Sequence, residues 1–426
     1  MPSSPCSTQT QRGAAALVVT MLLLFAMVLV AAFANRHLVF EQRSAANQAR
    51  STQAFEAAEA GLEWALAQLN TNRRIDAACL PNGDPAAPSF RSRYLAIARG
   101  TGLVTPMTWN QAGTPAALQV ACVRVGDGDG WACSCPTQGL PTLPAPIGSA
   151  PAAAFVLQFQ PVAKAGVVRA VATGCTSLAG ACLAGSTSRA DASAKLEVAL
   201  ALIGGLRTAP AATVTVRDAF DAGSATLGLH NPDPATGIAV DAGGAINAGQ
   251  ARLTAPAGAP RASALVGNDG ALAALDPQRL FASYFGVDKA HWQGQPAVTR
   301  IACTADCSAA LVAAIDAAPD AALIQVDGDL TLAGPLTLGS AQRPVAIVVS
   351  GAARLDGAVA VTGLLYAEAL QWADTAGGAF VRGALVSEAG YQGNGAPELF
   401  YDAAVLDLLK QRAGSFARVS GSWRDF

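Results

Sequence analysis

The fold is decided by the stretch QRGAAALVVTMLLLFAMVLVAAFANRH, residues 11–37. From Ala14 to Ala34 its only polar side chain is that of Thr20. As an α-helix this run would span roughly 30 Å, the thickness of the hydrocarbon core of a bilayer. The apolar part of a signal peptide is shorter, about 7–15 residues. The run therefore predicts a membrane-spanning helix over residues 14–35, although its end, Ala32-Phe33-Ala34, has the A-x-A form that signal peptidase cleaves.

Helical patterning continues beyond the membrane, over residues 36–70. Proline is absent from residues 41–69, and Gly61 is the only helix breaker there. Apolar residues recur at spacings of three and four, which is typical of a helix with one buried face; they are Phe55, Ala58, Leu62, Leu66 and Leu69. We expect one helix from Ala14 to Leu69. Its first half lies in lipid, and its second half is an amphipathic extracytoplasmic helix docked on a globular domain.

Composition and cysteines indicate the compartment. Charged residues make up 14% of the chain and the net charge is −2, so there is no electrostatic reason to expect a nucleic-acid partner. Cys6 precedes the apolar run, and the eight cysteines after it form an even set that favours disulfides in an oxidising compartment. Zinc is less favoured, because the close pairs lack C-x2-C spacing. Local disulfides are expected at Cys175–Cys182 and Cys303–Cys307. The pairing of the other four stays open: Cys79, Cys122, Cys133 and Cys135.

The order of these signals resembles a known family. QRGAAALVV, an apolar run and then QAFEAAEAGLEWAL is similar to the N-terminal domain of PilX-type minor pilins, which are type IV pilus assembly proteins. The resemblance implies that residues 1–13 are a leader, that prepilin peptidase cuts between Gly13 and Ala14, and that the new N-terminus is methylated. Major pilins carry Glu at the fifth mature position, where this chain has Val18. That departure suits a subunit at the tip of a fibre, as in GspK-type pseudopilins.

Residues 71–208 are expected to form a disulfide-stapled, pilin-like αβ domain. Residues 71–150 are rich in Pro, Gly and Cys, which indicates loops and short strands. Strand patterns follow at 152–163, 165–175 and 188–202, and they predict an antiparallel sheet. A long helix followed by such a sheet is the pilin plan, so the resemblance extends from residue 11 to about residue 203.

Residues 209–426 have a different texture. Ala209-Pro210-Ala211 marks a linker, and the rest consists of short apolar runs separated by Gly, Asn and Asp. This pattern predicts stacked turns of chain, each covering the apolar edge of the next. We expect a β-rich, solenoid-like domain, interrupted by a helix around Ser308–Ala318 and capped at one end by a helix at Asp402–Arg412. The fold class is α+β: a long N-terminal helix on a small antiparallel sheet, followed by this β-rich domain.

No catalytic residue or cofactor is expected. GDGDGWAC, with Asp127 and Asp129, is an incomplete calcium loop, because it lacks the third acidic position and the bidentate Glu. The three histidines belong to no catalytic motif. Asp327, Asp329 and Asp356 could lie on neighbouring strands, as in glycan-cleaving enzymes, but Asp-Gly turns explain them more simply. The chain is therefore interpreted as a non-enzyme.

The leading hypothesis is a minor pilin of PilX type in the bacterial inner membrane, with its C-terminal part in the periplasm and a place at the pilus tip after assembly. Its expected partners are other minor pilins, the pilus assembly platform, prepilin peptidase and a tip adhesin. One alternative is a GspK-like pseudopilin of a type II secretion system. The other is a membrane-anchored envelope enzyme or glycan-binding module.

Overall fold

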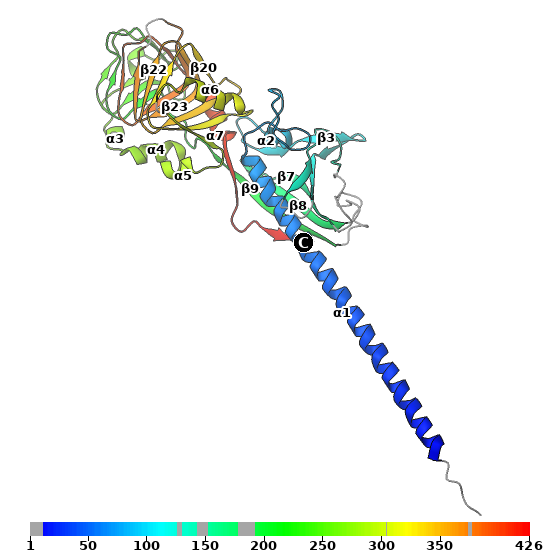
Figure 1. Ribbon diagram of the computed structural model, residues 1–426. Coiled ribbons are helices and arrows are strands. Elements are labelled where there is room, and N and C mark those ends of the chain that lie inside the picture. The colour runs from blue at the N-terminus through cyan, green and yellow to red at the C-terminus, as the bar shows by residue number, and fades with distance from the viewer. Residues whose placement is uncertain (1–11, 126–129, 143–151, 178–191, 304, 374–376) are drawn as a thin grey trace, which may run out of the picture.

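The computed structural model describes residues 12–125, 130–142, 152–177, 192–303, 305–373 and 377–426. Its longest element is a single helix, α1 (Arg12–Asn70), which confirms the continuous helix expected from the sequence. The first half of α1 stands clear of the rest of the chain, whereas its second half lies against folded structure (Figure 1).

The second half of α1 covers one face of a seven-stranded antiparallel sheet, which together with that part of α1 we call the body. The strand order is β6-β5-β7-β8-β9-β28, and β29 also pairs with β9. The strands are β5 (Gln119–Arg124), β6 (Trp131–Ser134), β7 (Ala152–Pro161), β8 (Val167–Ser177), β9 (Ala192–Gly204), β28 (Gly414–Arg418) and β29 (Arg424–Asp425). Alternate side chains of β7 face the helix, so Phe155, Leu157 and Phe159 are buried in one core with Leu62.

Small elements close the body near the end of α1. They are α2 (Phe90–Tyr94), the antiparallel pair β1 (Leu95–Ile97) and β2 (Val104–Pro106), and the hairpin of β3 (Thr108–Gln111) and β4 (Thr114–Ala117). Phe90 is fully buried and meets the Trp64 ring of α1 edge-on at 5.3 Å. Aromatic packing of this kind anchors α2 to the helix.

Residues 206–412, which we call the head, contain two further sheets. The large sheet has twelve strands: β10 (Ala212–Val216), β12 (Gly228–His230), β13 (Ile238–Ala242), β15 (Arg252–Thr254), β16 (Leu265–Val266), β17 (Val298–Ala302), β18 (Ala322–Asp327), β20 (Leu336–Leu338), β21 (Val345–Val349), β23 (Val359–Ala367), β25 (Phe380–Ser387) and β27 (Glu398–Tyr401). The small sheet has six: β11 (Phe220–Asp221), β14 (Ile246–Asn247), β19 (Leu330–Ala333), β22 (Ala352–Asp356), β24 (Ala369–Trp372) and β26 (Tyr391–Gly393).

Strands of the two head sheets alternate along much of the chain, and each turn that visits both sheets is here called a rung. The paired strands run parallel, for example β21 with β23 and β23 with β25. Equal positions therefore stack, and Ile347, Leu365 and Leu385 form a buried column between the sheets. The pairing establishes two parallel sheets, and a solenoid-like domain stays a prediction.

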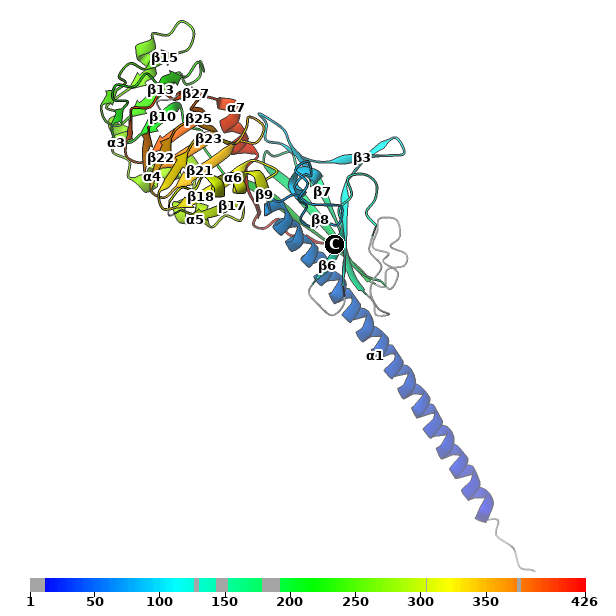
Figure 2. The ribbon, with the colours of Figure 1, turned by 45° about the horizontal axis from the view of Figure 1, so that its top comes forward.

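The rungs are not stacked in chain order. The strands made first, β10 to β12, pair with the strands made last, β25 to β27. Strands β13 to β15 then stack beyond β10 to β12, at the end of the head far from α1 (Figure 2). From there the chain returns to β17, which pairs with β18, and the remaining rungs lead back to β27.

Helices of the head cover the large sheet and one end of the core. They are the 3-10 turn η2 (Arg261–Ala264), α3 (Gly270–Ala273), α4 (Pro277–Phe285), α5 (Lys289–Gln293), α6 (Ser308–Ala317) and α7 (Ala403–Gln411). The expectation that the last helix caps one end is wrong. Leu406 and Leu409 of α7 pack on the outer face of the large sheet with Tyr366 and with Trp292 of α5. Helix α7 lies there because its apolar stripe covers apolar side chains that the large sheet directs outward.

The chain returns to the body at its C-terminal end. Strand β28 pairs with the end of β9, with Gly414 opposite Gly204, so the entry and exit of the head are adjacent. The predicted C-terminal domain of residues 209–426 therefore ends too late, because residues 414–425 complete the body sheet.

Candidate functional site

The most exposed apolar surface of the molecule is the first half of α1. Large apolar side chains are exposed all round the helix between residues 17 and 40, and their exposed fractions range from 41% for Val39 to 72% for Phe33 and Phe40. Within the described residues α1 is the one helix that is long and apolar enough to cross a membrane, and its most apolar window has a mean hydropathy of 2.9 and no buried part. A helix that is apolar all round needs lipid or other helices around it.

The one polar side chain between Ala14 and Ala34 is hydrogen-bonded within the helix. The hydroxyl of Thr20 donates a hydrogen bond to the backbone carbonyl oxygen of Leu17 at 2.9 Å, so it is satisfied within the helix. Val18, the fifth residue after Gly13, is 56% exposed and contributes only an apolar side chain to this surface. The Gly13–Ala14 bond lies in the first turn of α1, and its cleavage stays a prediction.

The second half of α1 docks on the body through one face. Ala58, Leu62 and Leu69 of the expected stripe are almost fully buried, whereas Phe55 and Leu66 are half-buried at its border. Small residues that sequence reasoning missed fill the centre of the face; they are Ala54, Ala57, Gly61 and Ala65. Their spacing of three and four can be read from the sequence, but that spacing does not show that small side chains are needed there.

Small side chains are needed because α1 lies unusually close to the sheet. A Cβ added to Gly174 of β8 would lie 2.0 Å from the backbone oxygen of Ala54 and 2.4 Å from the backbone nitrogen of Ala58. Contacts this short are impossible, so only glycine fits at this point of the sheet. Gly61, the one helix breaker in the sequence of this segment, makes room in the same way, because a Cβ there would lie 2.9 Å from the Phe155 ring.

The C-terminal end of α1 is joined to the strand that closes the body. The Asn70 side-chain amide donates to the Phe416 carbonyl oxygen at 2.9 Å, and the Phe416 backbone N–H donates to the Asn70 side-chain oxygen at 2.6 Å. Arg91 of α2 donates to the carbonyl oxygens of Leu69 at 2.8 Å and Gly414 at 2.7 Å. Burial lowers the pKa of the Arg91 guanidinium, while the Asp320 carboxylate acts in the opposite direction.

The body and the head meet at this same junction. Arg74 donates to the carbonyl oxygens of Asp316 at 2.7 Å and Ala317 at 3.0 Å, at the end of α6. The Trp292 indole N–H donates to the Gly205 carbonyl oxygen at 3.2 Å. Arg74 and Trp292 both donate to backbone carbonyl groups, and the Ser89 hydroxyl adds a side-chain contact to the Asp320 carboxylate of the head.

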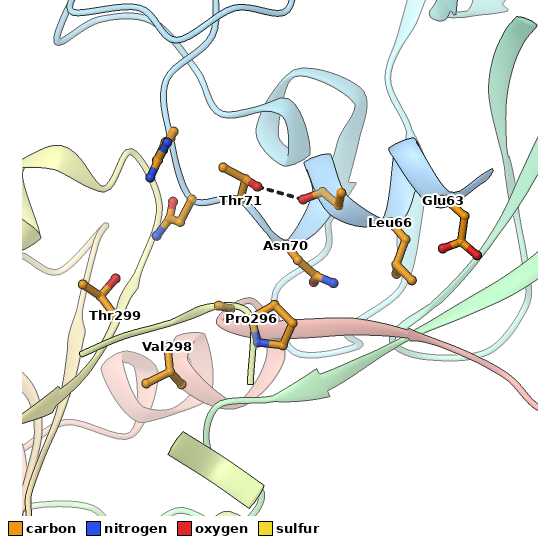
Figure 3. A pocket seen from close by; sticks show the side chains of 11 residues that line it. Glu63, Leu66, Asn70, Thr71, Pro296, Val298 and Thr299 are labelled. Atoms are coloured by element: carbon orange, nitrogen blue, oxygen red, sulfur yellow. Dashed lines mark hydrogen bonds between the residues drawn. The ribbon is translucent and has the colours of Figure 1, made fainter. Parts of the chain in front are cut away.

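An open groove of about 710 Å³ lies at the junction (Figure 3). One wall is the last two turns of α1, with Glu63, Leu66 and Asn70, and the other is the segment that leads into β17, with Pro296 and Val298. The Thr71 hydroxyl donates to the Ala67 carbonyl oxygen at 2.8 Å and so faces back to the helix. The groove is the place where one neighbour could touch α1 and the head at once.

Disulfides hold the loops of the body and one loop of the head. Cys79 is bonded to Cys135, Cys122 to Cys133 across β5 and β6, and Cys303 to Cys307 ahead of α6. Cys175 is disulfide-bonded, and its expected partner Cys182 lies outside the described residues. The bridge between Cys79 and Cys135 ties the segment after α1 to the end of β6, which supports the junction.

Each of the three candidate catalytic acids has a contact of its own elsewhere in the fold. Asp327 accepts from Arg300 at 2.7 Å, Asp329 accepts from the backbone N–H of Ala352, and Asp356 lies 3.5 Å from Arg354. Each carboxylate has its own structural partner. The calcium candidates Asp127 and Asp129 lie outside the described residues. Among the residues that the structure describes, no group of three or more His, Cys, Asp or Glu side chains could hold a metal ion.

One comparison with known proteins bears on this site. Residues 12–63 match the family model of the PilX N-terminal domain, which confirms the resemblance for the exposed part of α1 and most of its docking face. No curated protein matches the chain. Among solved structures, the chain is similar to the competence-associated pilin ComZ from Thermus thermophilus, with 12% identity, over 88% of this chain and 98% of that one. The TM-score is 0.27, too low to support a conclusion about fold or function.

Proposed function

We propose that this chain is a minor pilin of PilX type that takes part in the priming of type IV pilus assembly. The observation that carries the proposal is the PilX-type segment at residues 12–63, which coincides with a helix whose first half is apolar all round and exposed. Lipid surrounds this surface before assembly, and the equivalent helices of other minor pilins surround it afterwards.

The proposed mechanism is helix packing without chemistry. Helix α1 bundles with neighbouring helices through residues 15–40, while the close contact of Ala54, Ala58 and Gly174 keeps its second half rigid on the body. The head is too bulky to lie inside a bundle of helices, and it extends beyond the body at the end away from the exposed part of α1 (Figure 1). This arrangement supports a position at the pilus tip, where the head is not crowded by a subunit above.

Orientation and processing belong to the same proposal. The disulfide-bonded body and head would lie in the periplasm, because disulfides persist there and not in the cytosol. Prepilin peptidase would cut after Gly13, the assembly platform would extract the processed chain from the inner membrane, and a tip adhesin would contact the head. Val18 fits the tip because no subunit above it presents an N-terminus to be neutralised.

The first test is mass spectrometry of the N-terminus of protein purified from cell envelopes. N-methylated Ala14 is the expected result. A chain that begins at Asn35 would show signal-peptidase cleavage and sink the proposal, and an intact N-terminus would leave a plain membrane anchor. A Gly13→Leu variant should keep residues 1–13, whereas the matched control Ala16→Leu should be processed normally.

A second test distinguishes a pilus from a secretion system and the pilus tip from its shaft. Gold labelling of an epitope on the head should place the protein at pilus ends, and labels spaced along the shaft would contradict the tip position. Loss of protein secretion with normal pili after gene deletion would instead favour the GspK-like pseudopilin. If gene deletion causes a phenotype and the Gly13→Leu variant restores normal behaviour without being processed, the result would favour an envelope module that works without pilus assembly.

A further inference from the structure

Helix α1 carries three arginines, here called the arginine row, between its apolar segment and the body. Arg36, Arg43 and Arg50 are seven residues apart, which is close to two helical turns, so they lie on one side of the helix. The row turns by only about 20° per step. Its next position is Ala57, which is buried where α1 docks on the body. The arginine row therefore continues the docked side of α1 towards the part that stands clear of the body (Figure 1).

The arginine row has no counter-charge within the part of the chain that the structure describes. Arg36 and Arg43 are exposed and Arg50 is half-buried, and no ion pair joins any of the three to another described residue. Glu41 is the single acidic residue between positions 36 and 50, and its carboxylate lies 3.3 Å from His37 Nδ1 instead. A guanidinium donates several hydrogen bonds and accepts none. An ordered partner of the row must therefore carry negative charge at a matching spacing.

The place of the arginine row along α1 argues against lipid headgroups as its partner. The apolar run ends at Ala34. With that residue at the edge of the hydrocarbon core, Arg43 and Arg50 lie about 14 Å and about 24 Å beyond the edge, at 1.5 Å per residue. The headgroup layer is only about 5–8 Å thick. Arg36 can reach this layer, but the other two arginines stand outside it, so the row as a whole fits a protein partner better.

The second half of α1 has the opposite charge on its opposite side. Glu56, Glu59 and Glu63 are exposed, whereas the small residues between them are buried against the body, so these carboxylates face away from the sheet. Residues 51–70 contain no basic residue. Glu56 and Glu63 are seven residues apart, which is the spacing of the arginine row. A helix with a docked body can thus present an acidic face that matches such a row.

The geometry of a helix bundle brings two such surfaces together. Bulky bodies must lie outside a bundle of parallel helices, so the side of each helix that faces away from its body points inward. A chain shifted towards the tip then places its arginine row, on the body side, against the inward face of a lower neighbour's second half. For carboxylates placed as Glu56 and Glu63 are, a shift of 13 residues aligns them with Arg43 and Arg50, and a shift of 20 residues aligns them with Arg36 and Arg43. These shifts correspond to about 20 Å and about 30 Å.

We propose that the arginine row binds the acidic face of the N-terminal helix of the minor pilin directly beneath this chain in the tip complex. This partner rests on the proposed function. Exposed ion pairs contribute little affinity, so the role of the row is to select the partner and to fix the shift between the two helices. The acidic face of this chain is less available, because Glu63 already pairs with Arg418 of β28. That pairing suits a subunit with no arginine row above it.

The test is photo-crosslinking of the full chain in piliated cells, with p-benzoylphenylalanine introduced at Asn47. This exposed position lies between Arg43 and Arg50 on the same side of α1. Mass spectrometry should identify a peptide from the second half of another pilin's N-terminal helix, with Asp or Glu residues seven apart. Ala45, exposed on the opposite side of α1 at the same level, is the matched control and should not yield this peptide. Replacing all three arginines by Gln should lower the yield about tenfold, and replacing them by Lys should preserve most of it.

The N-terminus of the same preparations separates this inference from the proposed function. A chain that is not cut after Gly13 overturns both. With Ala14 methylated, the proposed function stands, and three results overturn the arginine row alone: crosslinks from Asn47 to phospholipid only or to nothing, the same peptide at equal yield from Ala45, or an unchanged yield in the triple Gln variant. If that variant does not reach the envelope, the single variants Arg43→Gln and Arg50→Gln take its place, and each should lower the yield.

Discussion

At the scale of single residues, glycine and small side chains decide how α1 meets the body. Gly174 faces the backbone of α1 directly, and Ala54 and Ala58 keep the opposite surface flat. Packing at this density tolerates no added atom without movement of the helix.

We therefore expect Gly174→Ala to destabilise the body by about 3 kcal/mol, because the new methyl group would push α1 away from β8. Thermal unfolding of the detergent-solubilised chain, followed by circular dichroism, measures the change. Gly83→Ala is the control, since a Cβ there meets nothing within 4 Å. An unchanged unfolding midpoint for Gly174→Ala would show that the close contact is not rigid.

The Arg91 side chain is a second single-residue determinant, because it satisfies carbonyl groups of α1, of the α7 end and of β28. Replacement by Gln leaves several of these buried acceptors unpaired, so we expect a loss of about 2–4 kcal/mol in the free energy of unfolding. Denaturant titration of the purified chain measures it. The exposed Arg99 offers a matched control, and Arg99→Gln should change the free energy of unfolding by less than about 0.5 kcal/mol.

Asp241 should make the stability of the head depend on pH. Burial raises the pKa of this carboxyl in the folded chain, and the Asp269 carboxylate adds to the effect. An acid with a raised folded pKa costs stability once pH exceeds its unfolded pKa, about 3.9, and the full cost applies above the folded pKa. Asp241→Asn should therefore raise the unfolding midpoint at pH 7 and leave it unchanged near pH 3. The exposed Asp407→Asn variant is the control, and an equal gain at both pH values would contradict the assignment.

At the scale of elements, α1 and the antiparallel strands β7 to β9 beneath it were predictable, and the closeness of their contact was not. The apolar run and the spacing of Ala58, Leu62 and Leu69 were enough to predict one helix with one docked face. Periodicity does not report residue size, so the close approach at Gly174 was not predicted. Phe55 is half-buried because the Trp423 ring of the tail meets it edge-on at 6.0 Å, a contact between residues far apart in the chain.

The membrane segment of α1 makes its own prediction. An Arg at the centre of the apolar run costs about 3 kcal/mol of membrane insertion, so Leu24→Arg should shift the protein from the membrane pellet to the soluble fraction in alkaline carbonate extraction. Leu24→Ala keeps the segment apolar and should stay in the pellet. Release of the Leu24→Ala variant into the soluble fraction would mean that residues 15–40 are not surrounded by lipid.

The contact between His230 and Glu398 illustrates the limit of sequence reasoning for parallel strands. His230 and Glu398 are far apart in the chain, and they become neighbours only because β12 pairs with β27. A short strand carries little information about which distant strand it will meet. The sequence indicated strands in this region, but the stacking of early rungs on late ones had no local signal.

At the scale of the whole molecule, the head is an insertion into one turn of the body sheet. Gly205 donates its backbone N–H to the Ala413 carbonyl oxygen at 2.9 Å, directly beside the Gly204–Gly414 pair. The body sheet therefore needs only a tight connection between β9 and β28. The chain passes between body and head twice, and the expected domain boundary near residue 208 is the first of these two places.

This insertion leads to a deletion experiment. Replacement of residues 206–412 by Asn-Gly, a favoured two-residue hairpin turn, should leave a body that folds and forms the Cys79–Cys135 and Cys122–Cys133 disulfides. If processing and helix packing depend on α1 and the body alone, as proposed, the variant should still be cut after Gly13 and should still pack through α1. Mass spectrometry of the disulfides and pilus counts in cells measure the outcome. A body that fails to oxidise correctly would show that body and head fold as one unit.

The order of the rungs also determines when each strand edge is covered as the chain is synthesised. Strands β10 to β12 are the first strands of the head to leave the ribosome. One of their two edges is covered only by β25 to β27, the last strands of the head. One edge of the body strand β9 is likewise covered only when β28 has been made. If the head is exported as proposed, these edges of the early strands stay uncovered until nearly the last residues have crossed the membrane. An incomplete chain would expose these edges to any chaperone or protease that it meets, whereas in the complete chain β25 to β27 and β28 cover them.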